Sequence, residues 1–277
     1  MDKTLTLVLG PTAVGKTDYA VSLAQEYGSP VISCDSRQIF SEMRIGTAPP
    51  SEEQLRAVRH YFIFSHSVSQ YYSAGLYEVE ALALLSELFK EHDRLVMVGG
   101  SGLYADAVCY GFDDFPPADQ ELRAELTARA VSEGVDVLAE ELRVLDPESY
   151  AVIDLSNRQR VVRALEVTLS TGRKFSSFKT APRKKRFFNV ERKILSMPRE
   201  ELYARIDRRA EKMFECGLVD EVRSLEKYRN MPALRTVGYR EVFDYLDGKI
   251  SLDEAVELVK RNTRRYAKRQ ITWFNRY

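Results

Sequence analysis

Short apolar runs alternate with longer amphipathic segments over the first hundred residues of the chain. Helix patterns run from Lys16 to about Tyr27, and from a capping Ser73 to about Lys90. Alternation of this kind predicts an α/β fold, in which helices cover both faces of a parallel sheet and ligands bind at the carboxyl ends of the strands. The runs that have the pattern of buried strands are 5–9, 30–34, 61–64 and 95–98.

The pattern changes at Pro116-Pro117. Residues 119–170 have consecutive helix patterns without a strand signal, and a strand pattern returns at 187–197 before further helical patterns continue to the end. The chain has room for one core domain that carries an inserted subdomain. We therefore expect a core of residues 1–115 and 187–277 and a helical insertion of residues 116–186.

The composition, with 44% apolar and 30% charged residues, is ordinary for a globular protein. No apolar run approaches the roughly 18–20 residues that a membrane-spanning helix needs, and the N-terminus has no signal-peptide pattern. The three cysteines lie far apart and the three histidines lack metal-ligand spacing, so neither a disulfide framework nor a zinc site is indicated. These features predict a reducing, cytoplasmic compartment.

The net charge of zero conceals an asymmetry along the chain. Residues 1–150 carry 11 basic and 24 acidic side chains, a net charge of −13, whereas residues 151–277 carry 30 and 17, a net charge of +13. Clustered cations suit a polyanionic partner. Solvated helix faces would produce the same count, so charge alone leaves both interpretations open.

The most specific motif, GPTAVGKT, fits the phosphate-binding pattern G-x-x-x-x-G-K-[ST] between a predicted strand and a predicted helix. Backbone N–H groups of such a loop, together with the helix N-terminus, bind phosphate oxygens. Lys16 would hold terminal phosphate oxygens, and Thr17 would contact Mg²⁺. The predicted diphosphate site consists of Gly10, Pro11, Thr12, Ala13, Val14, Gly15, Lys16 and Thr17.

Two further features occupy predicted strand ends. Asp35 follows the second strand directly. An acid at that place can support Mg²⁺, act as a general base or cap a turn, and the sequence leaves these three roles open. The glycine-rich turn at 99–102 follows the strand at 95–98, which makes it a candidate for lining the same pocket.

Basic side chains recur at helical spacing in two segments. Arg160 and Arg163 share one face of a helix that Ser156-Asn157 would cap, while Val161 and Leu165 fall on another face. In the last predicted helix, cations and rings alternate in a way that suits RNA, although the rings alone are more typical of a core. That stripe contains Arg261, Arg264, Arg265 and Lys268, with Tyr266, Trp273 and Phe274.

Eight motifs in order, spanning about residues 5 to 275, resemble the bacterial tRNA dimethylallyltransferase family, also called tRNA isopentenyltransferases. They are GPTAVGKT, DSRQIF with IGTAPP, YYSAGLYE, GGSGLY, NRQRVVRALEV with TG, LYARIDRRAEKM, TVGYREVFDYLDG and TRRYAKRQITWF. The resemblance implies a P-loop NTPase-like core with a helical insertion. It also implies transfer of a dimethylallyl group from dimethylallyl diphosphate to N6 of adenosine at position 37, in tRNAs that decode codons starting with U. Pyrophosphate would be released, Mg²⁺ would be the cofactor, and a monomer is expected.

The resemblance also assigns residues by matching position. Asp35 matches the family's general base, Arg205 and Arg209 match its diphosphate-binding arginine region, and residues 12–17 would also touch the isoprenoid group. Which of the two arginines matters more stays open. The positions that match tRNA contacts are Asp35, Ser36, Arg37, Gln38, Ser101, Arg123, Gln159, Arg160, Val161, Val162, Arg163, Arg235, Gly238, Tyr239 and Arg240.

The chain departs from the family pattern in two places. It has HYFIF where relatives commonly carry an acid shortly after the histidine, so no site role is assigned to the His60 segment. It also stops soon after TWF, where many relatives continue, and it lacks the zinc-finger extension of eukaryotic relatives. Three other activities fit a phosphate loop: an ATP-dependent small-molecule kinase, an isopentenyltransferase acting on free adenylate, and a non-catalytic RNA-binding ATPase. The insertion and the basic last helix favour tRNA over a free nucleotide.

Overall fold

The structure is a computed structural model that describes residues 2–113, 115–179 and 184–277. The chain divides into two compact units. The larger unit comprises Met1–Tyr110 and Arg186–Tyr277, and the smaller comprises Gly111–Lys185.

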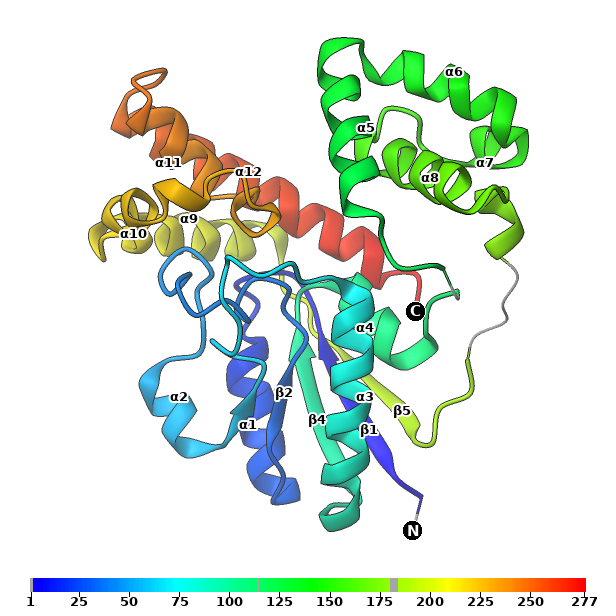
Figure 1. The fold of residues 1–277 in the computed structure, drawn as a ribbon. Helices are drawn as coiled ribbons and strands as arrows, with labels where there is room; N and C mark the ends of the chain where they lie inside the picture. The colour runs from blue at the N-terminus through cyan, green and yellow to red at the C-terminus, as the bar shows by residue number, and fades with distance from the viewer. Residues whose placement is uncertain (1, 114, 180–183) are drawn as a thin grey trace. The chain divides into compact units, whose positions relative to one another are not determined.

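Among the described residues, five parallel strands form a single sheet in the larger unit, in the order β3-β2-β4-β1-β5 (Figure 1). Leu9, the last residue of β1, pairs with Gly99 of β4 on one side and with Ile194 of β5 on the other. The strand that follows the smaller unit therefore lies directly beside the strand that precedes the phosphate loop. The strands are β1 (Thr4–Leu9), β2 (Val31–Ser33), β3 (His60–Tyr61), β4 (Arg94–Gly99) and β5 (Asn189–Ile194).

Both faces of the sheet are buried under helices. Side chains of successive strand residues point to opposite faces, so β1 contributes to two apolar clusters. Leu5, Leu7 and Leu9 belong to one apolar cluster, which also contains side chains of α3 and α4. Val8 belongs to a second cluster with side chains of α1. The near-continuous apolar pattern of the strands reflects this two-sided burial.

The helices of the larger unit fall into two groups along the chain. α1 to α4 alternate with the strands, and α9 to α12 follow β5. The sequence correctly places the start of α3, where the Ser73 hydroxyl accepts a hydrogen bond from the N–H of Leu76. The helices are α1 (Lys16–Tyr27), α2 (Glu52–Ala57), α3 (Ala74–Glu91), α4 (Gly102–Tyr110), α9 (Arg199–Glu215), α10 (Leu218–Ser224), α11 (Tyr239–Leu246) and α12 (Leu252–Phe274).

The described part of the smaller unit is helical. Leu126 of α5, Leu138 of α6 and Leu165 of α8 meet in its apolar core. Asn157 caps α8 by accepting a hydrogen bond from the N–H of Arg160, as the sequence predicts. The helices are α5 (Gln120–Ser132), α6 (Val135–Leu145), α7 (Pro147–Val152) and α8 (Arg158–Thr171), followed by a 3₁₀ turn at Phe175–Phe178.

Two predicted strands differ clearly in extent from the observed ones. The apolar run 61–64 is not a strand beyond Tyr61, because Phe62 and Phe64 have φ angles of +60° and +53°, which no β-ladder accommodates. The strand predicted at 187–197 is likewise shorter and covers 189–194. In the part of the chain that the structure describes, no helix combines the length and apolarity that spanning a membrane requires.

Candidate active site

The phosphate loop connects the end of β1 to the start of α1. Gly15, which precedes the helix, has a φ of +96°, and Ala13 has a φ of +68°, a left-handed conformation that is strained for a side chain with a Cβ. The Lys16 ammonium donates a hydrogen bond of 2.7 Å to the carbonyl of Pro11, so it lies over the loop. This geometry places a cation and a helix N-terminus at the same point, as phosphate binding requires.

The charge of Lys16 depends on its surroundings. Burial lowers the pKa of its ammonium to about 8, against the opposing effect of the Asp35 carboxylate, and the nearby Arg209 guanidinium lowers the pKa further. A lysine with this pKa is still mostly cationic at neutral pH. A bound diphosphate would hold it in the charged form.

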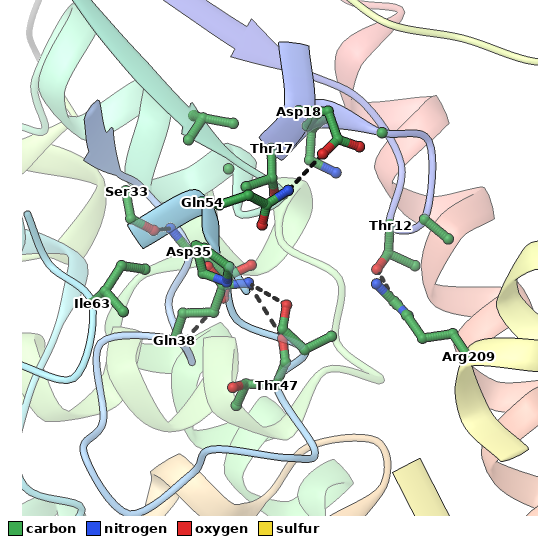
Figure 2. A pocket seen from close by; sticks show the side chains of 18 of the residues that line it. Thr12, Thr17, Asp18, Ser33, Asp35, Gln38, Thr47, Gln54, Ile63 and Arg209 are labelled. Carbon is green, nitrogen blue, oxygen red and sulfur yellow. Dashed lines mark hydrogen bonds between the residues drawn. The ribbon is translucent and has the colours of Figure 1, made fainter. Parts of the chain in front are cut away.

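Asp35 lies just beyond the end of β2 and lines the cavity described below (Figure 2). Its Oδ1 accepts hydrogen bonds from the N–H groups of Arg37, at 2.9 Å, and Gln38, at 3.4 Å. Its Oδ2 lies on the side of Gly100, 3.8 Å from the place that a Cβ on that glycine would take. Asp35 therefore caps a turn with one oxygen, as the sequence allowed, and this leaves the second oxygen for chemistry.

The glycine-rich turn after β4 lies against the Asp35 segment. A Cβ on Gly99 would come within 2.8 Å of the backbone of Cys34, so this close approach of two strand ends requires glycine. The Ser101 hydroxyl accepts a hydrogen bond of 3.0 Å from the N–H of Ser36 and lies 3.0 Å from the Ser36 hydroxyl. The candidate role of this turn in lining the same pocket is confirmed, since Gly99 and Gly100 line the cavity.

Two helices from the end of the chain hold the phosphate loop. Arg209 of α9 donates a hydrogen bond to the Thr12 hydroxyl (Figure 2). Gln270 of α12 accepts a hydrogen bond of 2.8 Å from the Thr12 N–H and donates one of 2.8 Å to the carbonyl of Gly100. The Gln270 amide therefore joins the two glycine loops. It is 5% exposed, and sequence analysis missed it, because a glutamine 258 positions away from Thr12 gives no local signal.

The cavity enclosed by these elements has a volume of about 370 Å³. It brings together the phosphate loop, Asp35 and the arginines of α9, which lie far apart in the sequence. Its wall includes Thr12, Ala13, Gly15, Lys16, Thr17, Asp18, Ser33, Asp35, Gln38, Thr47, Ala48, Pro50, Gln54, His60, Ile63, Val98, Gly99, Gly100, Arg205, Arg208, Arg209, Tyr266 and Gln270.

Several of these wall residues were not predicted from the sequence. His60 and Ile63 belong to the segment to which no role was assigned, yet both line the cavity. Gln54 of α2 donates a hydrogen bond of 2.5 Å to the Asp18 carboxylate (Figure 2). Tyr266 belongs to the basic stripe of α12, and burial raises the pKa of its phenol to about 12, so it stays a neutral hydrogen-bond donor.

The arginines predicted near the diphosphate differ in their contacts. Arg205 and Arg209 both line the cavity, but only Arg209 donates to the phosphate loop. Arg205 has a 4.0 Å contact with the sulfur of Met197. Burial lowers the pKa of the Arg209 guanidinium, although the Asp35 carboxylate counteracts this effect. The geometry favours Arg209 as the arginine closest to a diphosphate in the loop.

The positions predicted to contact tRNA fall into three classes by exposure. The side chains of Val161, Val162 and Tyr239 are at most 4% exposed, so they present almost no surface to RNA in this structure, and a contact at these positions stays a prediction. Gly238 is also buried. The exposed positions are Gln159, Arg160, Arg235 and Arg240, and the partly exposed ones are Asp35, Ser36, Arg37, Gln38, Ser101, Arg123 and Arg163.

Arg123 and Arg163 already have a partner within the smaller unit. Both donate to the carboxylate of Glu166, which is fully buried and also accepts a hydrogen bond from the N–H of Asp119. Arg163 donates further to the carbonyl of Pro116. A buried carboxylate between two guanidiniums satisfies their charge and orders the chain segment that leads into α5.

The pKa of Lys16 leads to a pH prediction. Raising the pH through about 8 removes the ammonium charge in the free enzyme, so kcat/KM for a diphosphate substrate is expected to fall above that pH. Initial rates at limiting diphosphate between pH 6.5 and 9.5 measure the effect. Lys16→Arg is the matched control, because its guanidinium stays charged and should flatten the decline even if it lowers the rate overall. A wild-type profile without a decline up to pH 9.5 would contradict the prediction.

Comparison with known proteins places the chain in a family. Residues 38–277 match the family model described as IPP transferase. The chain is 50% identical to tRNA dimethylallyltransferase 2 of Porphyromonas gingivalis, over 99% of this chain and 92% of the relative, and 49% identical to tRNA dimethylallyltransferase of Cytophaga hutchinsonii, over 100% and 91%. The full-length tRNA isopentenylpyrophosphate transferase of Bacillus halodurans has the same fold, with a TM-score of 0.72 and 38% identity over 100% of this chain and 88% of that one. The chain, a prenyltransferase with a P-loop NTPase-like core, therefore belongs to the IPP transferase family.

Proposed function

We propose that the protein transfers a dimethylallyl group from dimethylallyl diphosphate to N6 of adenosine at position 37 of tRNAs that decode codons starting with U. The observation that carries the proposal is a single cavity whose wall contains the phosphate loop, Arg209 and Asp35. The phosphate loop and Arg209 can bind a departing diphosphate, and the Asp35 carboxylate can accept a proton. The products are N6-dimethylallyladenosine and pyrophosphate.

The reaction breaks the bond between the allylic carbon and the diphosphate oxygen and forms a bond from that carbon to N6. The departing diphosphate gains negative charge, which Lys16, Arg209 and the loop amides stabilise. The exocyclic amine is a weak nucleophile and must lose a proton as the new bond forms. In the proposal, Oδ2 of Asp35 accepts that proton.

The residues of the loop fit a magnesium ion. Mg²⁺ is usually held by one or two protein oxygens together with substrate phosphates and water. The hydroxyl-bearing Thr17 lines the cavity and would contact the ion. No cluster of three or more His, Cys, Asp or Glu side chains suited to a metal occurs among the described residues. When bound, Mg²⁺ would neutralise part of the charge on the diphosphate.

The adenine has to leave its stack to reach the cavity, at an unstacking cost of a few kcal/mol that backbone contacts must offset. Exposed cations on α12, among them Arg261, Arg265 and Lys268, can supply such contacts, whereas Arg264 is paired with Asp207. The helical unit of residues 111–185 is proposed to contribute Gln159 and Arg160, which are exposed at the start of α8. We also propose that the protein acts as a monomer in the cytoplasm, where tRNA is available.

The direct test incubates the protein with Mg²⁺, dimethylallyl diphosphate and unmodified tRNA, followed by mass analysis of the nucleosides. N6-dimethylallyladenosine at a single position supports the proposal. A parallel reaction with AMP in place of tRNA tests the free-adenylate alternative, and one with ATP as donor tests the kinase alternative. Prenylation of AMP but not of tRNA would overturn the assignment, as would phosphate transfer from ATP without prenyl transfer.

The affinity for tRNA is expected to fall steeply with salt. Each phosphate contact contributes a slope of roughly −0.7 to −0.9 to a plot of log K against log salt concentration. Substituting Arg261, Arg265 and Lys268 together by Ala is expected to reduce the slope by about 2–3, as three lost contacts would. Fluorescence anisotropy with labelled tRNA between 50 and 300 mM salt measures the slope. A triple variant with the wild-type slope would show that these three cations of α12 do not contact RNA phosphates.

A further inference from the structure

Glu221 of α10 lies outside the cavity but binds a loop, residues 44–46, that leads into part of its wall. Its Oε2 accepts hydrogen bonds from the N–H groups of Arg44, at 2.8 Å, and Ile45, at 2.7 Å. Its Oε1 accepts one of 3.0 Å from the N–H of Gly46 and one of 2.6 Å from the hydroxyl of Tyr239. One carboxylate therefore has four donors.

Three successive backbone N–H groups that converge on one anion are a strong constraint on a loop. Hydrogen bonds to a charged acceptor are shorter and stronger than those between neutral groups. Without an acceptor, the three amides would be left without the partner they now share, and the loop would have to change conformation. Glu221 therefore fixes the backbone of residues 44–46 in one arrangement.

Tyr239 restrains the same loop through packing. Its ring is buried, and a Cβ on Gly46 would lie 2.5 Å from Cε2 and 2.9 Å from the hydroxyl oxygen of that ring. Only a glycine allows the backbone to approach the ring this closely. The loop is thus bonded to Glu221 and packed against Tyr239 at the same residue.

The residues that follow this loop reach the cavity. Thr47, Ala48 and Pro50 line its wall. The Gln38 amide donates hydrogen bonds to the carbonyls of Thr47, at 3.3 Å, and Ala48, at 3.0 Å, and the N–H of Gln38 donates to Oδ1 of Asp35. A continuous set of bonds therefore runs from the Glu221 carboxylate through the loop to Asp35.

We propose that Glu221 is a positioning residue of the active site, which fixes residues 44–46 and thereby sets the wall formed by Thr47, Ala48 and Pro50 around the bound diphosphate substrate. The inference rests on the proposed function. Glu221 does not line the cavity, so it acts only through the loop. Its loss should widen or displace the wall and weaken substrate binding before it affects the proton transfer.

The experiment compares a graded series of variants. Glu221→Leu removes all four acceptor contacts at similar volume, and it is expected to raise KM for dimethylallyl diphosphate about tenfold or more while kcat changes less. Tyr239→Phe removes one donor of the four and is expected to stay within about threefold of the wild type, since the three amides keep their acceptor. The Kd for tRNA, measured by anisotropy, is expected to stay within about twofold in both variants.

Two control variants separate positioning from charge and from stability. Asp220→Asn removes one negative charge from the adjacent residue of α10, where Asp220 is paired with Arg223 on the surface. Leu85→Ala leaves a cavity in a core cluster that contains none of residues 44–50, so it lowers the stability of the protein without touching the loop. Thermal unfolding of all variants allows the KM values to be compared at known stability.

The proposal is supported if Glu221→Leu raises KM and neither control does. It is overturned if Glu221→Leu leaves KM within twofold of the wild type, or if Leu85→Ala raises KM equally at an equal loss of Tm. Calorimetric binding of inorganic pyrophosphate tests the positioning role separately from the reaction. If the wild-type protein prenylates no tRNA, the proposed function fails. Weaker pyrophosphate binding by Glu221→Leu would then still support the positioning role, and equal binding would overturn it.

Discussion

Asp35→Asn is expected to lower the rate of prenyl transfer by about 10²–10⁴, the usual contribution of a positioned general base. Asparagine is nearly isosteric with aspartate and keeps a carbonyl oxygen that can accept from the N–H groups of Arg37 and Gln38. The turn at the end of β2 should therefore persist. The oxygen on the side of Gly100 is replaced by an amide nitrogen, which cannot accept a proton. The variant separates the general base from the turn cap, two roles that the sequence alone could not distinguish.

Single-turnover rates with excess enzyme over labelled tRNA measure this effect without a contribution from product release. Affinity for tRNA should change little, because Asp35→Asn removes a negative charge and no cation. Asp18→Asn is the matched control, since Asp18 is a second carboxylate of the same cavity but is bound to Gln54. A single-turnover rate within tenfold of the wild type for Asp35→Asn would exclude the general-base role.

Local patterns predicted those elements whose cause is local. The phosphate loop, the caps at Ser73 and Asn157 and the strands β1 and β4 depend on residues within a few positions of each other, and the structure has them where the sequence indicates. The strand at 61–64 was predicted from apolar residues alone. The left-handed backbone at Phe62 and Phe64 ends the strand after Tyr61, and no side-chain pattern predicts that conformation.

Contacts between residues far apart in the chain could not be predicted from local sequence patterns. Glu166 and Arg163 are three positions apart, but Arg123, which binds the same carboxylate, is 43 positions away from it. The sequence therefore does not indicate that both arginines are paired within the protein. Gln270 and Glu221 act on loops 258 and about 175 positions away. Motifs predicted the positions of the phosphate loop and Asp35 at strand ends, whereas the residues that hold these groups in place became visible only in three dimensions.

Arg209→Ala is expected to lower kcat/KM for dimethylallyl diphosphate by about 10²–10³, as the loss of one donor to a developing oxyanion does. Arg209 contacts Thr12 inside the phosphate loop. In the proposed reaction its guanidinium would therefore lie beside the oxygens that gain charge when the allylic bond breaks. The effect should appear in kcat as well as in KM, because that charge is larger in the transition state than in the bound substrate.

Arg205→Ala is the matched control for this prediction. Arg205 lies on the same helix and lines the same cavity, but its contact is with the sulfur of Met197 and not with the loop. The same loss of one guanidinium should therefore cost less than about tenfold at this position, since it changes the field of the cavity without removing a donor to the leaving group. Steady-state kinetics of both variants, with thermal unfolding to verify the fold, make the comparison. An equal loss for the two variants would mean that the diphosphate responds to the overall positive charge of α9, and a larger loss for Arg205→Ala would assign the leaving-group contact to Arg205.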